Sequence, residues 1–279
     1  MLRNKLKNAK GFVFDMDGTL VLGDKESGNH KALPGAAEML AHLRSRGIPY
    51  QVFTNGTART PLWYANSLRH AGLDVRDDEM MTPSTSAAHY LKEKGVDRVL
   101  VLGKEPVWSP LQEAGLSIVE SPGNGGSYDA IFVGWFREFT FPDLEAAAQA
   151  VWDGALLTTA SNVPFFAAAG GKAIGTSFAI NAMLKALTDT DALVLGKPST
   201  EALNVAMARM GLDSAHPEEI VVVGDDPELE VRMANEHGAL SVSVATGLYS
   251  TEDFAAQEKV QLPDLILNNV NELVELMES

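Results

Sequence analysis

Short apolar runs alternate with amphipathic stretches along most of the chain. The runs are three to five residues long and mostly apolar, which is typical of parallel strands covered on both faces. Between them apolar residues recur at helical spacing. The alternation predicts an α/β protein with a Rossmann-like parallel sheet and helices on both faces. The predicted strands are residues 12–14, 50–53, 99–102, 130–133, 155–158, 193–195, 220–223 and 240–244.

The middle of the chain differs in character from its two ends. It contains a Gly-rich loop at 121–127 and an Ala-rich loop at 165–175. Periodicity leaves two arrangements open for residues 82–191: the continuation of one long sheet, or an inserted second domain.

Composition narrows the class of protein. The 279 residues are 46% hydrophobic and 21% charged, as in soluble globular proteins of one or two domains. Acidic residues outnumber basic ones by 37 to 22, and the net charge of −15 argues against a nucleic-acid partner. The chain has no cysteine, which excludes disulfides, Cys-based zinc sites, iron–sulfur clusters and thiol nucleophiles.

The hydropathy pattern places the protein away from membranes. No stretch approaches the ~18 apolar residues of a membrane span. Near the N-terminus the apolar run is only residues 11–14, too short for the core of a signal peptide. We therefore expect a cytoplasmic protein with no membrane partner.

Polar residues of unusual type follow four of the predicted strands. In an open parallel sheet, ligands bind beyond the carboxyl ends of the strands. If the four strands share one sheet, their polar residues converge on one site. The segments are DMDGT at 15–19, TNGT at 54–57, GKPS at 196–199 and GDDP at 224–227.

The carboxylates among these polar residues predict a bound cation. Asp15, Asp17 and Asp225 would repel one another within a partly buried site, at a cost of several kcal/mol for charges about 4 Å apart. A metal ion removes this repulsion, and an all-oxygen set without His or Cys favours Mg²⁺.

The remaining polar residues suit a phosphate group. Thr54, Asn55 and Lys197 supply hydroxyl, amide and ammonium donors. Thr60 followed by Pro61 predicts a helix start just beyond them, whose positive end also favours an anion. A metal, phosphate donors and a spare carboxylate describe phosphoryl transfer, with Asp15 as the natural nucleophile.

Each motif also has a purely structural interpretation. An Asp-x-Asp-Gly segment is commonly an Asx turn, and Asp226 before Pro227 is a good helix N-cap. Lys197 alone would be a solvated lysine. The six histidines are scattered without ligand spacing, so we expect surface or helix-face roles for them. The four motifs together, in this order at strand ends, favour a functional site.

The four motifs resemble those of the haloacid dehalogenase (HAD) superfamily of aspartate-nucleophile phosphatases. Residues 15–19 match its first motif, Thr54 the second, Lys197 the third and residues 224–226 the fourth. The long segment between the second and third motifs resembles the NagD-type, p-nitrophenyl phosphatase-like branch. That resemblance implies a discontinuous catalytic core at 1–81 and 192–279 and an inserted α/β cap domain at 82–191.

The resemblance also implies a two-step hydrolysis. In that scheme Asp15 attacks phosphorus, and Asp17 protonates the leaving oxygen and then activates water. Mg²⁺ is held by Asp15, the Asp17 carbonyl and Asp225, and it balances charge together with Lys197. Thr54 and the backbone of residues 55–56 (Asn55 and Gly56) hold the phosphoryl oxygens. The cap closes over the substrate, and an assembly of copies through the cap is left open.

Three positions depart from the pattern of that branch. Phe136 and Pro164 replace acidic residues of the cap, and Glu230 replaces the last Asp of the fourth motif. The sequence therefore leaves two residues open as the outer support of the metal, Asp226 and Glu230. The cap aromatics have two interpretations: they pack the core of the cap, or they line the leaving-group side of the pocket.

The function predicted from the sequence is a Mg²⁺-dependent phosphatase acting on a small phosphorylated metabolite. Two alternatives stand beside it: a phosphomutase of the same fold, and a non-catalytic protein that binds a phosphorylated metabolite. The presence of Asp17 favours catalysis, because a binding protein needs no acid or base at that position.

Overall fold

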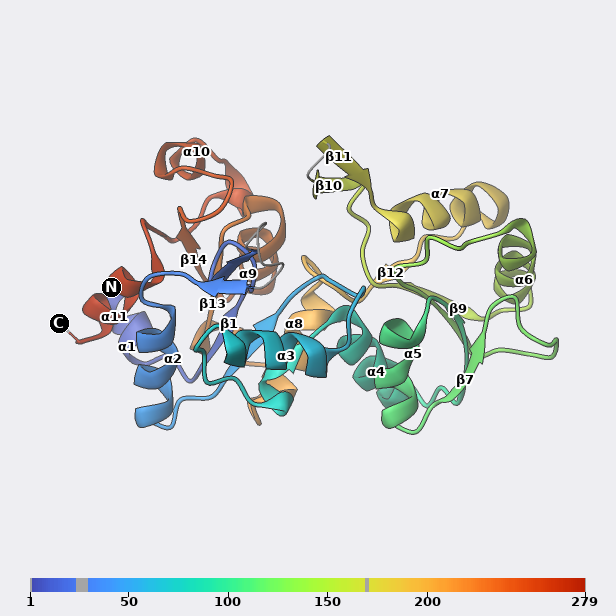
Figure 1. Ribbon diagram of the computed structural model, residues 1–279, viewed down its shortest axis with the longest axis horizontal. Coiled ribbons are helices and arrows are strands. Elements are labelled where there is room, and N and C mark those ends of the chain that lie inside the picture. Colours follow the sequence, from blue (N-terminus) through green and yellow to red (C-terminus); the bar gives the residue numbers. More distant parts are fainter. Residues whose placement is uncertain (1, 24–29, 169–170, 279) are drawn as a thin grey trace. The chain divides into compact units, whose positions relative to one another are not determined.

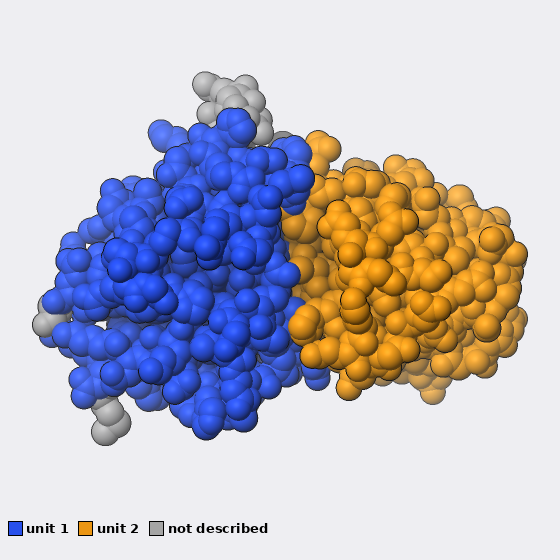
Figure 2. Space-filling model, turned by 90° about the horizontal axis from the view of Figure 1, so that it is seen from below, with its two compact units in different colours: residues 1–54, 62–81, 198–279 blue, residues 55–61, 82–197 orange. Residues whose placement is uncertain are grey.

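The computed structural model describes residues 2–23, 30–168 and 171–278 (Figure 1). The chain forms two compact units, which Figure 2 colours separately. Unit 1 consists of residues 1–54, 62–81 and 198–279, and unit 2 of residues 55–61 and 82–197. Each unit contains a parallel sheet with helices on both faces, which confirms the predicted α/β class.

Unit 1 is built on a six-stranded parallel sheet in the order β15-β14-β13-β1-β4-β5. Its central strands are buried along their whole length, because helices cover both faces. In the register of the sheet, Phe14 lies opposite Val223 on one side and Val52 on the other. The strands are β1 (Gly11–Phe14), β4 (Tyr50–Phe53), β5 (Met80–Met81), β13 (Ile220–Gly224), β14 (Leu240–Val244) and β15 (Leu265–Leu267).

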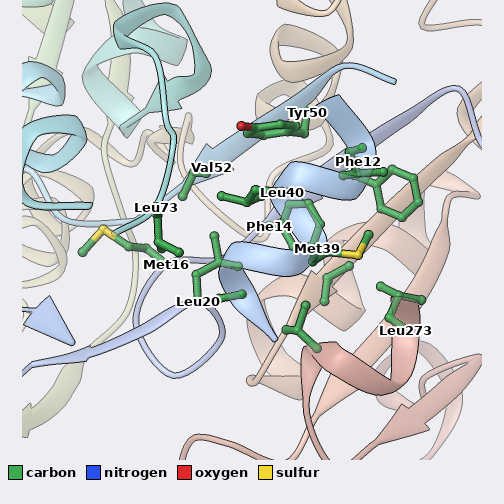
Figure 3. Packing of buried hydrophobic residues seen from close by; sticks show 14 of the residues in the cluster. Phe12, Phe14, Met16, Leu20, Met39, Leu40, Tyr50, Val52, Leu73 and Leu273 are labelled. Carbon is green, nitrogen blue, oxygen red and sulfur yellow. The ribbon is translucent and has the colours of Figure 1, made fainter. Parts of the chain in front are cut away.

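Alternate residues of β1 enter two separate cores of unit 1. Phe12 and Phe14 belong to the core on the side of α2, where Leu40 packs beside them (Figure 3). Val13 belongs to the core on the opposite face. Truncating a buried side chain such as Leu40 to alanine costs about 2–5 kcal/mol. The first core is covered by α1 (Leu2–Lys7), α2 (Ala36–Ser45), α3 (Pro61–His70) and α11 (Val270–Glu278), and the second by α8 (Thr200–Arg209) and α9 (Arg232–His237).

A short antiparallel hairpin follows the first sequence motif. It consists of β2 (Val21–Gly23) and β3 (His30–Ala32), with Val21 opposite Ala32 and Gly23 opposite His30. The sequence pattern predicted no strand here, because segments of three residues are too short to show a period of two. The hairpin returns the chain toward the loop at residues 15–19.

Unit 1 also contains the short helix α10 (Thr251–Ala255).

A largely buried ion pair of Arg44 and Glu79 lies beside β4 in unit 1. Arg44 donates to both carboxylate oxygens of Glu79, at 3.0 and 2.9 Å, and the backbone N–H of Arg76 donates to the same carboxylate at 2.8 Å. Glu79 is 4% exposed. Burial alone would raise the pKa of Glu79, but the hydrogen bonds from Arg44 and Arg76 outweigh it and hold that pKa below its ordinary value of 4.5.

Unit 2 contains a five-stranded parallel sheet in the order β12-β9-β8-β6-β7. Helices α4 and α5 pack on one face and α6 and α7 on the other. No helix in the described part of the chain is long and apolar enough to cross a membrane. The strands are β6 (Arg98–Leu102), β7 (Ser117–Glu120), β8 (Ala130–Val133), β9 (Leu156–Thr159) and β12 (Leu193–Val194), with a separate hairpin of β10 (Phe165–Ala168) and β11 (Gly171–Ile174). The helices are α4 (Pro83–Glu93), α5 (Glu105–Glu113), α6 (Phe141–Trp152) and α7 (Thr176–Thr188).

The two boundaries expected at residues 81 and 191 differ from the observed division in two places. Residues 192–197 group with unit 2 because β12 pairs with β9 in the sheet of that unit. Residues 55–61 group with it as well. Within them, the Thr57 hydroxyl accepts a hydrogen bond from the backbone N–H of Trp135 at 3.1 Å. The second boundary therefore lies after residue 197.

Candidate active site

The loop after β1 carries the first two predicted carboxylates. The backbone N–H of Asp15 donates to the Val223 carbonyl at 2.8 Å, which extends the pairing of β1 with β13 by one residue. Gly18 adopts a φ of +91°, and its N–H donates to the Val21 carbonyl at 2.8 Å, so the loop turns back tightly. Asp15 is 8% exposed, whereas the Asp17 side chain is 54% exposed. The loop thus presents one shielded carboxylate and one that solvent reaches.

The fourth motif lies beside the first. Phe14 pairs with Val223, and β1 and β13 are parallel. The residues that follow the two strands therefore lie side by side at the same edge of the sheet. The Asp225 carboxylate lies against two glycines: a Cβ at Gly18 would be 2.2 Å from its Oδ2, and one at Gly247 would be 1.7 Å from the same atom. A side chain at either glycine would therefore displace Asp225. The structure brings the first and fourth motifs together, as their position at strand ends predicted.

The carboxylates of Asp226 and Glu230 both contact backbone of the fourth motif. Asp226 Oδ1 accepts from the backbone N–H of Glu228 at 2.8 Å, so Asp226 is the N-cap of the following turn, as its position before a proline predicted. Glu230 is 2% exposed, and its Oε2 accepts from the backbone N–H of Asp226 at 3.2 Å. A Cβ at Gly224 would be 2.2 Å from Glu230 Cγ. Glu230 thus supports the loop that carries Asp225.

The surroundings of Asp225 are strongly negative. Burial raises the pKa of the Tyr249 hydroxyl, and the nearby negative charges, led by Asp226 and Glu228, raise it further. A region whose carboxylates oppose the ionisation of a neighbouring group also attracts a cation.

The donor set fits a hard divalent cation. Asp15 and Asp225 contribute carboxylates at one sheet edge, and the glycine cradle holds the second of them against the loop that contains the Asp17 carbonyl. Mg²⁺ takes oxygen ligands and is commonly bound through one or two carboxylates, with water completing its shell. Among the residues that the structure describes, no group of three or more His, Cys, Asp or Glu side chains is arranged to hold a metal. The set that the family resemblance implies has two carboxylate side chains, those of Asp15 and Asp225, and the backbone carbonyl of Asp17.

Thr54 occupies the same edge of the unit 1 sheet. Thr54 directly follows β4, and β4 pairs with β1 through Val52 and Phe14. Thr54 therefore lies at the end of the strand next to β1, which Asp15 follows. Its backbone N–H donates to the Met81 carbonyl at 3.2 Å, and the residue is 6% exposed. The predicted helix start at Pro61 is confirmed by α3.

The third motif does not follow a strand of the unit 1 sheet, which corrects the expectation that all four motif strands share one sheet. Its strand, β12, has only two residues and pairs with β9 in unit 2. Lys197, three residues beyond β12, belongs to unit 2 and is 2% exposed. The interpretation of Lys197 as a solvated surface lysine is therefore wrong.

The side chain of Asn55 is bound to the backbone of Lys197. Asn55 Nδ2 donates to the Lys197 carbonyl at 2.9 Å, and the Lys197 N–H donates to Asn55 Oδ1 at 2.8 Å. The chain passes close by at Gly196, where a Cβ would lie 2.2 Å from the Ala160 carbonyl. The sequence predicts the Asn55 amide as a donor to a phosphate. The pairing instead leaves the backbone N–H groups of residues 55–56 as the predicted phosphate donors of this segment.

One residue beside the first motif, His30, could not be predicted from the sequence. His30 Nε2 lies 3.3 Å from Asp17 Oδ1, and its Nδ1 lies 2.7 Å from Ser67 Oγ. The histidine side chain is 13% exposed, so the expected surface role is wrong for it. A lone histidine without ligand spacing carries no pattern, and only the hairpin brings it to Asp17.

The structure decides between the two interpretations of Phe136. The residue is 6% exposed, lies in the core of unit 2, and meets Phe139 edge to face at 6.3 Å between ring centroids. Lys104 Nζ lies 5.3 Å from the Phe136 ring centroid. Phe136 therefore packs the core of unit 2. Pro164, by contrast, is exposed, and the neighbouring Phe165 is 46% exposed.

Two family models match the chain. Residues 12–117 match a model described as haloacid dehalogenase-like hydrolase, and residues 194–273 match a model described as HAD-hydrolase-like. The first range contains Asp15 and Thr54, and the second contains Lys197 and Asp225.

Individual relatives are similar over nearly the whole chain. The acid sugar phosphatase of Staphylococcus haemolyticus is 26% identical over 274 residues, which cover 98% of each protein. The crystal structure of a 4-nitrophenylphosphatase from Thermotoga maritima matches with a TM-score of 0.83 and 26% identity, covering 98% of this chain and 99% of that one. A glycerol phosphate phosphatase from Mycobacterium tuberculosis, solved in complex with magnesium, matches with a TM-score of 0.79 and 27% identity. The match covers 96% of this chain and 77% of that one.

Proposed function

Because the chain belongs to the haloacid dehalogenase-like hydrolases and is a phosphoric monoester hydrolase, we propose that it uses Mg²⁺ and an aspartyl-phosphate intermediate to dephosphorylate a small metabolite. The observation that carries this proposal is the juxtaposition of the first and fourth motifs. The Asp225 carboxylate lies against Gly18. Asp15 directly follows β1, Asp225 directly follows β13, and these two strands are paired.

The proposed metal ligands are Asp15, the Asp17 carbonyl and Asp225. When bound, Mg²⁺ would offset the negative charge of the two carboxylates and of the phosphoryl group. The cradle formed by Gly18 and Gly247 supports this assignment, since it fixes the Asp225 carboxylate beside the loop of the first motif.

In the first proposed step, a carboxylate oxygen of Asp15 attacks phosphorus in line. The bond between phosphorus and the ester oxygen breaks, and Asp17 gives its proton to that oxygen. The exposures of the two side chains suit these roles. Asp15 is shielded from bulk water, whereas Asp17 is accessible to a leaving group.

In the second step, Asp17 takes a proton from a water molecule, which attacks phosphorus. The bond between phosphorus and Asp15 breaks, phosphate leaves, and both carboxyl groups return to their starting states. A phosphomutase, which would return the phosphoryl group to a hydroxyl of its substrate, remains the alternative within this fold.

The phosphoryl oxygens are assigned to Thr54, the backbone N–H groups of residues 55–56, and Lys197. Thr54 precedes Asn55 in the chain, and Asn55 binds the Lys197 backbone, so chain connectivity supports grouping these donors. Lys197 is buried, and an ammonium in a water-poor site stabilises developing negative charge more strongly than one in bulk solvent.

The proposal is tested by measuring phosphate release from a panel of sugar phosphates, glycerol phosphates, nucleotides, pyridoxal phosphate and 4-nitrophenyl phosphate. We expect turnover of at least one ester with Mg²⁺ and none with excess EDTA. Asp225→Asn should raise the Mg²⁺ concentration required, and Asp15→Asn should be inactive at every concentration. Asp189→Asn, at an exposed position, serves as the control and should behave as the parent. Undiminished turnover in EDTA would contradict the metal assignment.

A further inference from the structure

His30 contacts the side chain assigned as the acid and base. Its Nε2 lies 3.3 Å from Asp17 Oδ1. The two partners differ in exposure, 13% for the histidine side chain and 54% for the aspartate side chain. A mostly buried ring therefore contacts a carboxylate whose side chain is about half exposed.

The His30 ring is held from its other side by α3. Its Nδ1 lies 2.7 Å from Ser67 Oγ, and the ring meets Trp63 edge to face at 6.2 Å between centroids. Trp63 and Ser67 are four residues apart on α3 and thus occupy the same helix face. The backbone of His30 is fixed as well, because it pairs with Gly23 across the hairpin.

These contacts specify one arrangement of the neutral ring. In its ionised form the Asp17 carboxylate only accepts hydrogen bonds, so in that form Nε2 is the nitrogen that carries the proton toward Asp17. Nδ1 then accepts from the Ser67 hydroxyl. Ser67, whose hydroxyl can donate or accept, is compatible with this tautomer and helps to hold the ring in place.

We propose that His30 is a positioning residue that holds the Asp17 carboxyl group in the orientation from which it protonates the leaving oxygen. This inference rests on the proposed phosphatase function. An exposed aspartate on a loop would otherwise sample several rotamers, and misplacing a reacting group by about 1 Å can cost up to roughly 10²-fold in rate. Ser67 and Trp63 hold the ring that anchors Asp17.

This role makes the effect of removing His30 depend on the leaving group. An alkyl phosphate releases an alkoxide, which must be protonated as the bond to phosphorus breaks. A 4-nitrophenyl phosphate releases a stabilised phenolate, which departs without that proton. Loss of the positioning contact should therefore slow the first ester and spare the second, whereas a general distortion of the fold would slow both.

The experiment compares kcat/KM for glycerol phosphate and 4-nitrophenyl phosphate in the parent enzyme and in His30→Ala. For each ester, kcat/KM reports the steps up to and including the first phosphoryl transfer. We expect His30→Ala to lower it roughly tenfold or more for the alkyl ester and less than about twofold for the aryl ester. His30→Gln, which can place an amide N–H near the position of Nε2, should recover part of the loss on the alkyl ester.

Two further variants complete the test. Ser67→Ala removes the partner of Nδ1 and should show the same selectivity at smaller size, so the inference stays testable if His30→Ala fails to fold. His89→Ala removes a histidine of unit 2 that contacts Glu93 at 3.2 Å, and should leave both esters unaffected. Equal losses on the two esters in His30→Ala and Ser67→Ala would overturn the positioning role. A folded parent that hydrolyses neither these esters nor any of the wider panel would contradict the proposed function instead.

Discussion

The side-chain amide of Asn55 forms two hydrogen bonds with the backbone of Lys197, 142 residues further along the chain. One atom of the amide donates and the other accepts, so both backbone polar groups of Lys197 are satisfied. The pairing joins the segment after the second motif to the third motif within unit 2. We infer that Asn55 acts on the reaction through the placement of Lys197.

Replacing Asn55 with alanine should therefore impair catalysis without removing a group that reacts. Both hydrogen bonds are lost, and two buried backbone groups lose a partner, which costs about 1–3 kcal/mol of stability for each group left unsatisfied. We expect kcat to fall roughly 10- to 100-fold because Lys197 is no longer held in place. Steady-state kinetics and thermal unfolding measure the two effects. Parent-like kcat would show that the placement of Lys197 does not depend on this contact.

Lys197 should act through its charge. The side chain is almost fully buried, and an ammonium in a water-poor site stabilises developing negative charge more strongly than one in bulk solvent. Lys197→Met removes the ammonium but keeps an unbranched side chain of similar length, and it should lower kcat by roughly 10²-fold or more. The matched control is Lys185→Met, since Lys185 forms exposed ion pairs with Asp189 and Asp191. A rate for Lys197→Met close to that of the control would contradict a role in phosphoryl transfer.

The pair of Arg44 and Glu79 predicts a dependence of stability on pH. The pKa of Glu79 is lowered in the folded protein, so the stability that its ionised form contributes is present above its ordinary pKa and is lost as pH falls through the lower, folded value. Glu79→Gln should lower the free energy of unfolding by about 3 kcal/mol at neutral pH.

Urea unfolding at neutral pH and at about pH 3 checks this sign. The difference between the parent and Glu79→Gln should shrink toward the acidic end. Asp77→Asn removes an exposed ion pair with Arg69 and should cost less than about 1 kcal/mol at either pH. A difference that grows on acidification would contradict the assignment.

The sequence predicted those parts of the site that depend on one strand and its following loop. Asp15 and Asp225 follow apolar runs that are buried strands, and the rule that parallel strands end at a common edge placed them together. The same reasoning misplaced the third motif, because a run of apolar residues does not specify which sheet it joins. Pairing partners are set by tertiary contacts, which a local pattern does not contain.

Residues that act through contacts distant in sequence were beyond prediction for a related reason. The amide of Asn55 matched the expected phosphate donors in type, yet it binds backbone that only the folded chain brings near. His30 became relevant through a hairpin whose strands are too short to show periodicity. Phe136 was ambiguous because an aromatic side chain suits a core and a pocket equally well.

The central claim is that Asp15 becomes phosphorylated during turnover, and chemical trapping tests it most directly. The enzyme is mixed with Mg²⁺ and a substrate ester found in the phosphatase panel, quenched in acid during turnover, and reduced with borohydride, which converts an aspartyl phosphate to homoserine. Peptide mass spectrometry then locates the modified residue. We predict homoserine at position 15, and none in Asp15→Asn or in enzyme without substrate. Steady phosphate release by the parent with no homoserine at position 15, or turnover by Asp15→Asn, would contradict the account.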